Sequence, residues 1–138
     1  MTAPAPPAIA LEAVSKRFGS VTAVADVSLT VGRGEFFALL GPSGSGKSTL
    51  LGLIAGFHGA DAGTIRIDGE DVTRLPAHER NLGMVFQNYS LFPNLDVNAN
   101  VAFGLRMRRR PRPEIESRVE RALRIVRLEQ YGGARLTS

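Results

Sequence analysis

The feature that most constrains this chain is a glycine-rich stretch, G-P-S-G-S-G-K-S, at residues 41–48. It matches the pattern G-x-x-x-x-G-K-[S/T], in which a loop joins a buried strand to a helix and its backbone N–H groups bind phosphate. Gly41, Gly44 and Gly46 permit backbone angles and a close approach that a Cβ atom would block. The chain is therefore predicted to contain a strand–loop–helix unit that binds a nucleoside triphosphate at the positive end of the helix.

The residues on either side of this loop fit the same interpretation. Residues 35–40 are a short, nearly continuous apolar run, which predicts a strand buried on both faces of a parallel sheet. Residues 47–56 carry apolar side chains at helical spacing and end in glycine, which predicts a buried helix. Lys47 would bring a positive charge to the β- and γ-phosphates, and the Ser48 hydroxyl would bind Mg²⁺ together with phosphate oxygens. Thr49 is expected to donate to the α-phosphate.

Hydrophobic periodicity predicts further elements before and after the loop. Residues 9–16 and 23–31 alternate with a period of two, which indicates strands. Residues 64–67 are predicted to form a hairpin with a short partner that follows the turn at Asp68 and Gly69. These segments predict an antiparallel sheet in the first half of the chain.

The second half of the chain has a different pattern. Residues 82–86 are another apolar run and predict a second buried strand, whereas residues 88–98 are loop-like. Pro113 then opens a helix, as proline at the first helical position commonly does. The apolar stripe of this helix is expected to consist of Ile115, Val119, Ala122, Leu123 and Val126.

Composition excludes several kinds of protein. The 138 residues include no cysteine, which excludes disulfides and cysteine-based metal sites. No apolar run approaches the ~20 residues of a membrane-spanning helix. Residues 1–8 lack the basic start and apolar stretch of a signal peptide, so we expect a flexible tail on a cytoplasmic protein.

Colinear stretches on both sides of the loop narrow the identification. They are K-R-F-G at residues 16–19, G-E-F-F-A-L-L-G-P-S-G-S-G-K-S-T-L-L at 34–51, I-A-G-F at 54–57, D-A-G-T-I-R-I-D-G-E-D-V-T at 61–73, R-N-L-G-M-V-F-Q-N-Y-S-L-F-P at 80–93 and N-V-A-F-G-L at 100–105. Together they resemble the ATP-binding subunits of ABC transporters. Within that family they are most similar to subunits of importers for spermidine and putrescine, ferric iron, sulfate or sugars.

The resemblance implies an α/β fold, namely a fragment of the P-loop NTPase cassette of ABC transporters. It would comprise an antiparallel β part, the strand and helix of the phosphate loop, and the start of the helical subdomain. Residues 9–138 would be the N-terminal portion of this nucleotide-binding domain, ending before the signature motif, the Walker B strand, the catalytic glutamate and the switch histidine. We therefore expect the full-length parent to be an ATPase, this chain alone to be inactive, and the sheet edge beside residues 35–40 to be exposed.

The resemblance also implies a role for each residue of the site. Phe18 lies where the family has an aromatic ring that stacks on adenine, and Gln87 matches a glutamine that reaches Mg²⁺ and the attacking water. Lys47 and Gln87 are thus the expected catalytic residues, and Ser48 and Gln87 the expected metal ligands. The expected ATP-binding residues are Phe18, Gly41, Ser43, Gly44, Ser45, Gly46, Lys47, Ser48 and Thr49. The alternatives are a core phenylalanine at position 18 and a plain strand-ending glutamine at position 87.

Partners follow from the same resemblance. Residues 88–93 would contact transmembrane permease subunits, and a second copy of the ATP-binding subunit would complete each ATP site. A solute-binding protein would act indirectly, a polyamine is the favoured transported solute, and the protein would lie peripherally at the cytoplasmic face of the membrane. Asn94 and Ala99 stand where the family often has histidine and an acidic residue, which bears on the details of the permease contact.

Positive charge is concentrated in one segment of the chain. Residues 106–127 contain nine arginines and three glutamates, so the net charge of +4 is the sum of +6 there and −2 elsewhere. The favoured interpretation is a solvated helix face, with Glu114–Arg118 and Glu120–Arg124 ion pairs worth about 0.3 kcal/mol each. Contact of residues 106–112 with the membrane subunit or lipid headgroups ranks second. Nucleic acid is not an expected partner, because aromatic residues are scarce there.

Two other functions remain open on the sequence alone. The first is a soluble ABC-type ATPase of translation or DNA repair, which would not co-purify with membrane subunits. The second is a nucleotide-binding module that never hydrolyses ATP. A GTPase is not favoured, because the chain contains neither N-K-x-D nor D-x-x-G.

Overall fold

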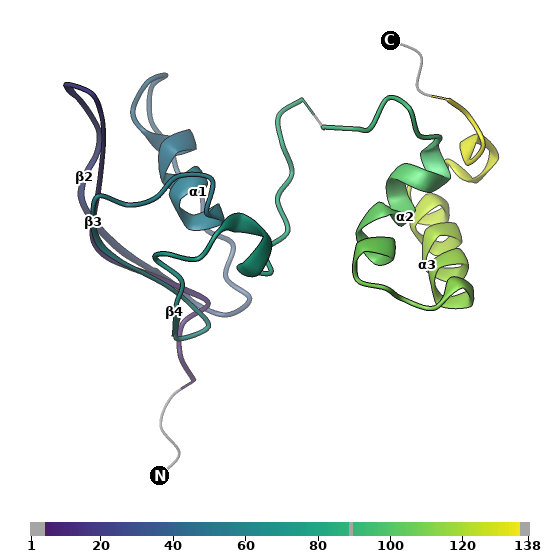
Figure 1. Cartoon of the computed structure of the whole chain (residues 1–138), viewed down its shortest axis with the longest axis horizontal. Helices are drawn as coiled ribbons and strands as arrows, with labels where there is room; N and C mark the ends of the chain where they lie inside the picture. The colour runs from purple at the N-terminus through teal and green to yellow at the C-terminus, as the bar shows by residue number, and fades with distance from the viewer. Residues whose placement is uncertain (1–4, 89, 136–138) are drawn as a thin grey trace. The chain divides into compact units, whose positions relative to one another are not determined.

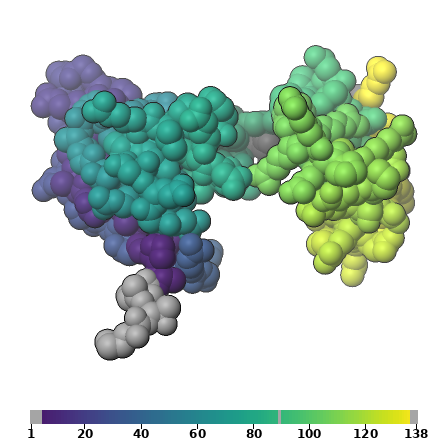
Figure 2. Space-filling view, turned by 60° about the horizontal axis from the view of Figure 1, so that its bottom comes forward, coloured from purple at the N-terminus to yellow at the C-terminus, as the bar shows by residue number. Residues whose placement is uncertain are grey.

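The computed structural model describes residues 5–88 and 90–135. The chain divides into two compact units, Met1–Met84 and Val85–Ser138, called here the first and the second unit. They are the purple-to-teal and the green-to-yellow bodies of Figure 2. Of the predicted tail, residues 1–4 lie outside the described residues, and Ala8 accepts a backbone hydrogen bond from Asp68.

The first unit is built on a four-stranded sheet in the order β2-β1-β3-β4, and every pair of neighbours is antiparallel. The strands are β1 (Ile9–Phe18), β2 (Val21–Val31), β3 (Ala62–Ile67) and β4 (Glu70–Asp71). As Figure 1 shows, β1 and β2 form a long, curved ribbon. The antiparallel part predicted from the alternation is thus confirmed, and its first strand extends to Phe18, where the sequence predicted an end at residue 16.

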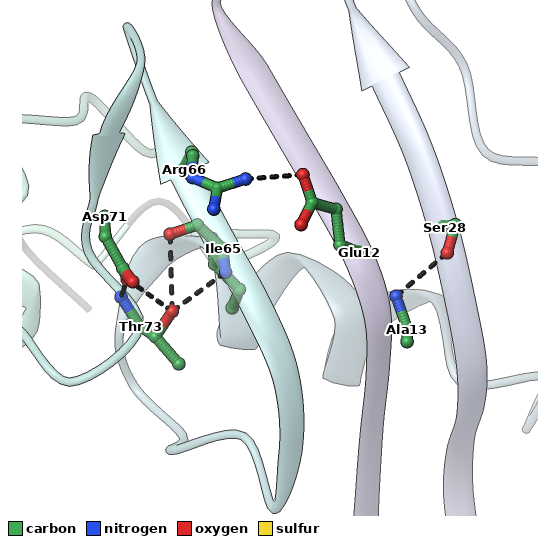
Figure 3. A network of polar contacts seen from close by, with 7 residues as sticks. All are labelled: Glu12, Ala13, Ser28, Ile65, Arg66, Asp71 and Thr73. Atoms are coloured by element: carbon green, nitrogen blue, oxygen red, sulfur yellow. Dashed lines mark hydrogen bonds and ion pairs between the residues drawn. The ribbon is translucent and has the colours of Figure 1, made fainter.

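A β-bulge in β1 explains why its buried residues do not keep a strict period of two. Leu11 and Val14 are both buried although they are three residues apart. Between them Ala13 has a left-handed backbone with φ of 52°, and its N–H donates to the Ser28 hydroxyl at 2.8 Å (Figure 3). The extra residue restores the inward face after the bulge. Gly63 of β3 is required opposite, because a Cβ there would lie 2.4 Å from the Ala13 carbonyl oxygen.

Polar side chains fasten the β3–β4 hairpin. The Thr73 hydroxyl accepts from the N–H of Ile65 at 2.9 Å and donates to the Asp71 carboxylate at 2.6 Å (Figure 3). Hydrogen bonds from the Thr73 hydroxyl and then from the Thr73 N–H, at 2.9 Å, lower the pKa of Asp71 below its usual value. The turn residues Asp68 and Gly69 have φ of 51° and 87°, as a two-residue type I′ hairpin requires. The hairpin prediction is confirmed.

Helix α1 (Lys47–Ala55) covers one face of the sheet and ends at Gly56, whose φ of 84° is that of a left-handed cap. The predicted helix and its stop are therefore confirmed. The buried core between helix and sheet consists of Leu11, Val14, Val24, Leu50, Leu53, Ile54, Ile65 and Val72. This packing fixes α1, and with it the loop at its N-terminal end.

Arg80 holds the other end of α1. It follows the short 3₁₀ helix η1 (Ala77–Glu79) and is only 5% exposed. Its guanidinium donates to the carbonyls of Leu53 and Ile54 at 2.6 and 3.0 Å. Further bonds reach the carbonyls of Leu75 and Thr73 at 2.8 and 3.3 Å. Burial lowers the pKa of Arg80, and the carbonyl dipoles offset the cost of that burial.

The two segments predicted as buried strands are not strands. Residues 35–40 and 82–86 have no regular structure, and Phe36 and Val85 are 95% and 90% exposed. A parallel strand needs hydrogen-bonded neighbours on its edges, and within residues 5–88 and 90–135 no strand pairs with either segment. Leu39 alone among the apolar residues of 35–40 packs against the core of the first unit. The expectation of an exposed sheet edge beside residues 35–40 presupposed a strand there, whereas in the described residues this segment belongs to no sheet.

The second unit is a helix pair. It contains α2 (Val97–Met107), α3 (Arg112–Ile125) and the 3₁₀ helix η2 (Glu129–Tyr131). The Asp96 carboxylate caps α2 by accepting from the N–H of Ala99 at 2.6 Å, a start that the sequence reading had missed. Ala102, Val119 and Leu123 form the core, with Val97 and Ile115 packed against it. The predicted helix after Pro113 is confirmed, but Val126 of its expected stripe is 58% exposed.

Candidate nucleotide-binding site

The candidate site begins at the N-terminal end of α1. Gly46 is the N-cap residue, no side chain caps the helix, and its first turn contains no acidic residue. The first N–H groups of a helix have no partner within the helix, and they carry the positive end of its dipole. This helix start is therefore suited to bind an anion, as the sequence predicted.

Glycine is required where the loop meets the sheet. Gly44 and Gly46 have φ of 81° and 84°, in the left-handed region that other residues rarely adopt. A Cβ on Gly46 would lie 2.2 Å from the carbonyl oxygen of Ala23 on β2. The loop backbone thus rests directly against β2, which fixes the direction of the N–H groups that follow.

Lys47 lies across its own loop. Its ammonium group donates to the carbonyls of Gly41 and Pro42 at 2.9 and 2.7 Å and to the Ser45 hydroxyl at 3.1 Å. All three acceptors belong to the loop, so the charge is held at the place where the sequence predicts the phosphates. An anionic phosphate oxygen is a stronger acceptor for an ammonium group than these neutral oxygens are.

A cleft of about 380 Å³ connects these groups. Its lining combines the start of β2 with the loop and the first turn of α1: Val21, Thr22, Ala23, Ser43, Gly44, Ser45, Gly46, Lys47, Ser48 and Thr49. The structure therefore brings seven of the predicted ATP-binding residues together around one space, whose lining carries five hydroxyl groups, one ammonium and no carboxylate. This donor set fits a triphosphate.

A magnesium ion also fits this donor set. The Ser48 side chain is exposed and lines the cleft, so its hydroxyl can reach a cation held by phosphate oxygens. Mg²⁺ in nucleotide sites typically has few protein ligands and keeps several waters. In the part of the chain described, no group of three or more His, Cys, Asp or Glu residues could hold a metal ion.

Phe18 ends β1 and pairs with Val21, which lines the cleft. Its ring is 46% exposed and meets the His58 ring edge to face, with centroids 5.5 Å apart. The Lys16 ammonium lies 5.5 Å from the centroid of the same ring. An exposed aromatic ring beside the cleft is available for stacking, and the alternative of a buried core phenylalanine is not what the structure shows.

Asp61 fixes the strand end that carries Phe18. Its carboxylate accepts from the Lys16 ammonium at 2.8 Å and from the Arg17 N–H at 2.7 Å. These two bonds, with Lys16 first, lower the pKa of the Asp61 carboxyl. Asp61 thus joins the start of β3 to the end of β1, a positioning role that sequence analysis missed although the residue lies in a quoted motif.

Gln87 belongs to the second unit, where it lies exposed in a turn. Its role as a metal ligand and catalytic residue stays a prediction. Of residues 88–93, which were expected to meet a membrane subunit, Tyr89 lies outside the described residues. The Phe92 ring packs on Phe103 of α2 with centroids 4.3 Å apart.

Asn100 anchors this segment on α2. Its side-chain oxygen accepts from the N–H of Phe92 at 2.8 Å, while its amide donates to the carbonyls of Phe92 and Leu95, both at 3.1 Å. Sequence analysis assigned Asn100 no role, nor Arg80, although both begin stretches that carried the resemblance. The sequence gives no direct signal for such anchors, because the backbone groups that they bind come near them only in the folded chain.

Comparison with known proteins identifies the fold of the chain. The solved structure of a dimeric ATP-binding cassette, in a post-hydrolysis state with ADP and phosphate, matches 92% of this chain with a TM-score of 0.80 and 30% identity. The match covers 61% of that cassette. The expected fold, a fragment of an ABC cassette, is therefore confirmed.

Sequence relatives lead to the same family. The spermidine/putrescine import ATP-binding protein PotA of Pasteurella multocida is 49% identical over 91% of this chain, and the sulfate/thiosulfate import ATP-binding protein CysA of Gloeobacter violaceus is 52% identical over 91%. The chain spans about a third of the length of these relatives, 34% and 36% respectively. A family profile described as ABC transporter matches residues 24–137, and this chain belongs to that family.

Proposed function

We propose that this chain is the ATP-binding part of an importer's ATPase subunit, and that it binds ATP with Mg²⁺ in the cleft beside β2. One observation carries the proposal. The uncapped start of α1, the close approach of Gly46 to Ala23 and the Lys47 ammonium converge on one cleft without a carboxylate. This arrangement attracts an anion and has little other use on the surface of a protein.

Each part of the nucleotide has an assigned partner in this proposal. The adenine ring stacks on Phe18, a contact worth roughly 1–3 kcal/mol by analogy with bases on aromatic platforms. Backbone N–H groups of the loop and Lys47 bind the phosphates, Ser48 binds Mg²⁺, and Thr49 donates to the α-phosphate. Gln87 completes the site through the metal and the attacking water.

The transport role is proposed from the family and from the loop before α2. The two relatives named above are import proteins, and the solved cassette is a dimer. Two ATP-binding subunits would therefore associate and drive paired membrane permeases from the cytoplasmic face of the membrane. The permease contact is proposed to lie at residues 88–93. The 54% exposure of Leu91, beside Phe92 that Asn100 and Phe103 hold, supports this proposal. In the described part of the chain, no helix is long and apolar enough to cross a membrane.

A polyamine is the proposed transported solute. Relatives named for spermidine and putrescine import include PotA of Pasteurella multocida and PotA of Vibrio parahaemolyticus. The Vibrio protein is 52% identical over 90% of this chain, and the chain covers 33% of its length. Selection of the solute belongs to the membrane subunits and to a solute-binding protein. Purifying the transporter with its permeases and measuring spermidine against sulfate uptake tests this assignment.

A second function, nucleotide binding without hydrolysis, is favoured by the composition of the cleft. Its lining holds no carboxylate that could orient the attacking water. We expect this chain alone to bind ATP and to show no ATPase activity above background. A turnover near the ~1–100 s⁻¹ typical of phosphoryl-transfer enzymes, abolished by Lys47→Ala, would contradict this.

The experiment that tests ATP binding compares four variants in a titration with a fluorescent ATP analogue. Lys47→Ala should abolish binding, whereas Arg33→Ala, which removes an exposed charge elsewhere in the first unit, should not. Phe18→Ala should weaken ATP and ADP alike and leave competition by inorganic phosphate unchanged. Phe36→Ala is the control for Phe18→Ala, because it removes an exposed aromatic ring that does not line the cleft. Equal affinities for Lys47→Ala and the wild type, with circular dichroism unchanged, would refute the proposed phosphate site.

A further inference from the structure

One strongly charged feature of the second unit has no part in nucleotide binding. The segment from the end of α2 to the start of α3, residues 106–112, contains five arginines and is called here the arginine turn. Between Asp96 and Glu114 the chain has no acidic residue. Figure 1 shows that the turn lies at one end of the helix pair. All five arginines are exposed, so their charges face solvent.

The backbone of the arginine turn is ordered by its own hydrogen bonds. The N–H of Arg109 donates to the carbonyl of Arg106 at 2.9 Å, and the N–H of Arg110 donates to the carbonyl of Leu105 at 3.1 Å. Arg109 has φ of 52°, a left-handed conformation that glycine adopts at no steric cost. Any residue with a Cβ atom is strained at such a position, and here that residue is an arginine.

Ion pairs divide the arginines of the helix pair into two groups. Along α3, Arg112, Arg118 and Arg124 pair with Glu116, Glu114 and Glu120 at 2.8, 2.8 and 2.5 Å. Arg106, Arg109 and Arg110 have no ion-pair partner among residues 5–88 and 90–135. The three glutamates of α3 thus pair with three of its four arginines, Arg121 being the exception, and none of them pairs with Arg106, Arg109 or Arg110.

We propose that the arginine turn is a docking surface for a membrane rich in anionic phospholipid. A guanidinium binds phosphate oxygens in a bidentate manner, and clustered arginines gain from the negative potential of an anionic leaflet. Met107, next to Arg106 at the end of α2, is 66% exposed and adds an apolar side chain that can enter the headgroup region. The turn has no aromatic ring on which a base could stack, so lipid is favoured over nucleic acid. This surface lies outside the nucleotide cleft and does not depend on ATP binding.

Flotation with vesicles tests the proposal, because bound chain rises with the lipid whereas aggregated chain sinks. The chain should float with mixed phosphatidylglycerol and phosphatidylcholine vesicles and not with pure phosphatidylcholine, and added salt should weaken binding. Replacing Arg106, Arg109 and Arg110 with glutamine should lower partitioning about a hundredfold, since each basic residue near an anionic leaflet contributes roughly fivefold. Replacing the same three with lysine should largely retain binding.

A matched control removes three charges elsewhere on the helix pair. Replacing Arg118, Arg121 and Arg124 with glutamine changes the net charge equally but should lower partitioning far less. Equal losses in the two triple variants would show that binding follows net charge alone and would overturn the proposal. Tighter binding to a duplex oligonucleotide than to vesicles, or full displacement by inorganic phosphate, would overturn it as well. Circular dichroism confirms that each variant keeps its helices.

Discussion

The apolar residues of the first unit occupy two contrasting environments. In the antiparallel sheet, Ile65 lies between β1 and β4 under α1 and is fully buried. In residues 35–40 the equally apolar Phe36 is 95% exposed. Both stretches contain strand-forming residues, so local propensity does not account for the difference. What differs is that β3 has strands paired on both of its edges, whereas residues 35–40 have none among the described residues.

The contrast shows what an apolar run can and cannot predict. A hairpin strand finds its partner a few residues away in sequence, so its prediction needs only local information. A strand of a parallel sheet depends on neighbours that lie far away in sequence. The solved cassette is longer than this chain, which covers 61% of it. We therefore expect residues 35–40 and 82–86 to form ladders when the rest of such a cassette is present.

The largest expected effect is the difference in unfolding free energy between truncating a buried and an exposed apolar side chain. Ile65→Ala should destabilise the first unit by about 2–5 kcal/mol, because it leaves a cavity in the core. Phe36→Ala should change the free energy of unfolding by no more than ~0.5 kcal/mol and should reduce aggregation. Urea denaturation followed by circular dichroism measures both. Similar losses for the two variants would show that residues 35–40 are packed in solution.

A smaller effect is expected at the end of α1. Arg80→Met should cost about 2–3 kcal/mol, because it leaves the carbonyls of Leu53 and Ile54 buried without a charged donor. Arg80→Lys should recover only part of this, since one ammonium group cannot reach all the carbonyls that the planar guanidinium bonds. Arg74→Met, on an exposed arginine of the same unit, is the control. Equal thermal stability of Arg80→Met and Arg74→Met would show that the hydrogen bonds of Arg80 do not stabilise the first unit.

The smallest expected effect is a pH-dependent change in thermal stability at Asp61, which fixes the strand end that carries Phe18. Because hydrogen bonds from Lys16 and Arg17 lower the folded-state pKa of Asp61, its carboxylate stabilises the fold above the pKa of the unfolded chain. This contribution is lost as the pH falls through the lowered folded-state pKa. The wild type should therefore melt above Asp61→Asn at neutral pH, and the gap should close below about pH 4. Glu70→Gln, in the exposed strand β4, should show no such gap. A gap that persists at low pH would contradict the assigned role.

Much of the fold was predictable because its signals are local. The Gly-rich loop predicted the start of α1, and the Asp68-Gly69 turn predicted the hairpin. The bulge at Ala13 was not predictable from alternation, because it depends on the Ser28 hydroxyl in the neighbouring strand. Arg80 and Asn100 bind backbone carbonyls that only the folded chain brings within reach. The start of α2 was missed although Asp96 is a common N-cap residue, because loop-like composition surrounds it.

The central claim, that the loop before α1 binds the phosphates of ATP, is tested most directly by amide NMR of the isotope-labelled chain. On titration with Mg²⁺ and ATP, the amide signals of Gly44, Gly46 and Lys47 should shift first and most, because those N–H groups face the bound anion. The signal of Val119 in α3 should not move. AMP, which lacks the β- and γ-phosphates, should produce much smaller shifts at the loop. Unchanged loop signals at saturating ATP, or equal shifts at Gly46 and Val119, would contradict the account.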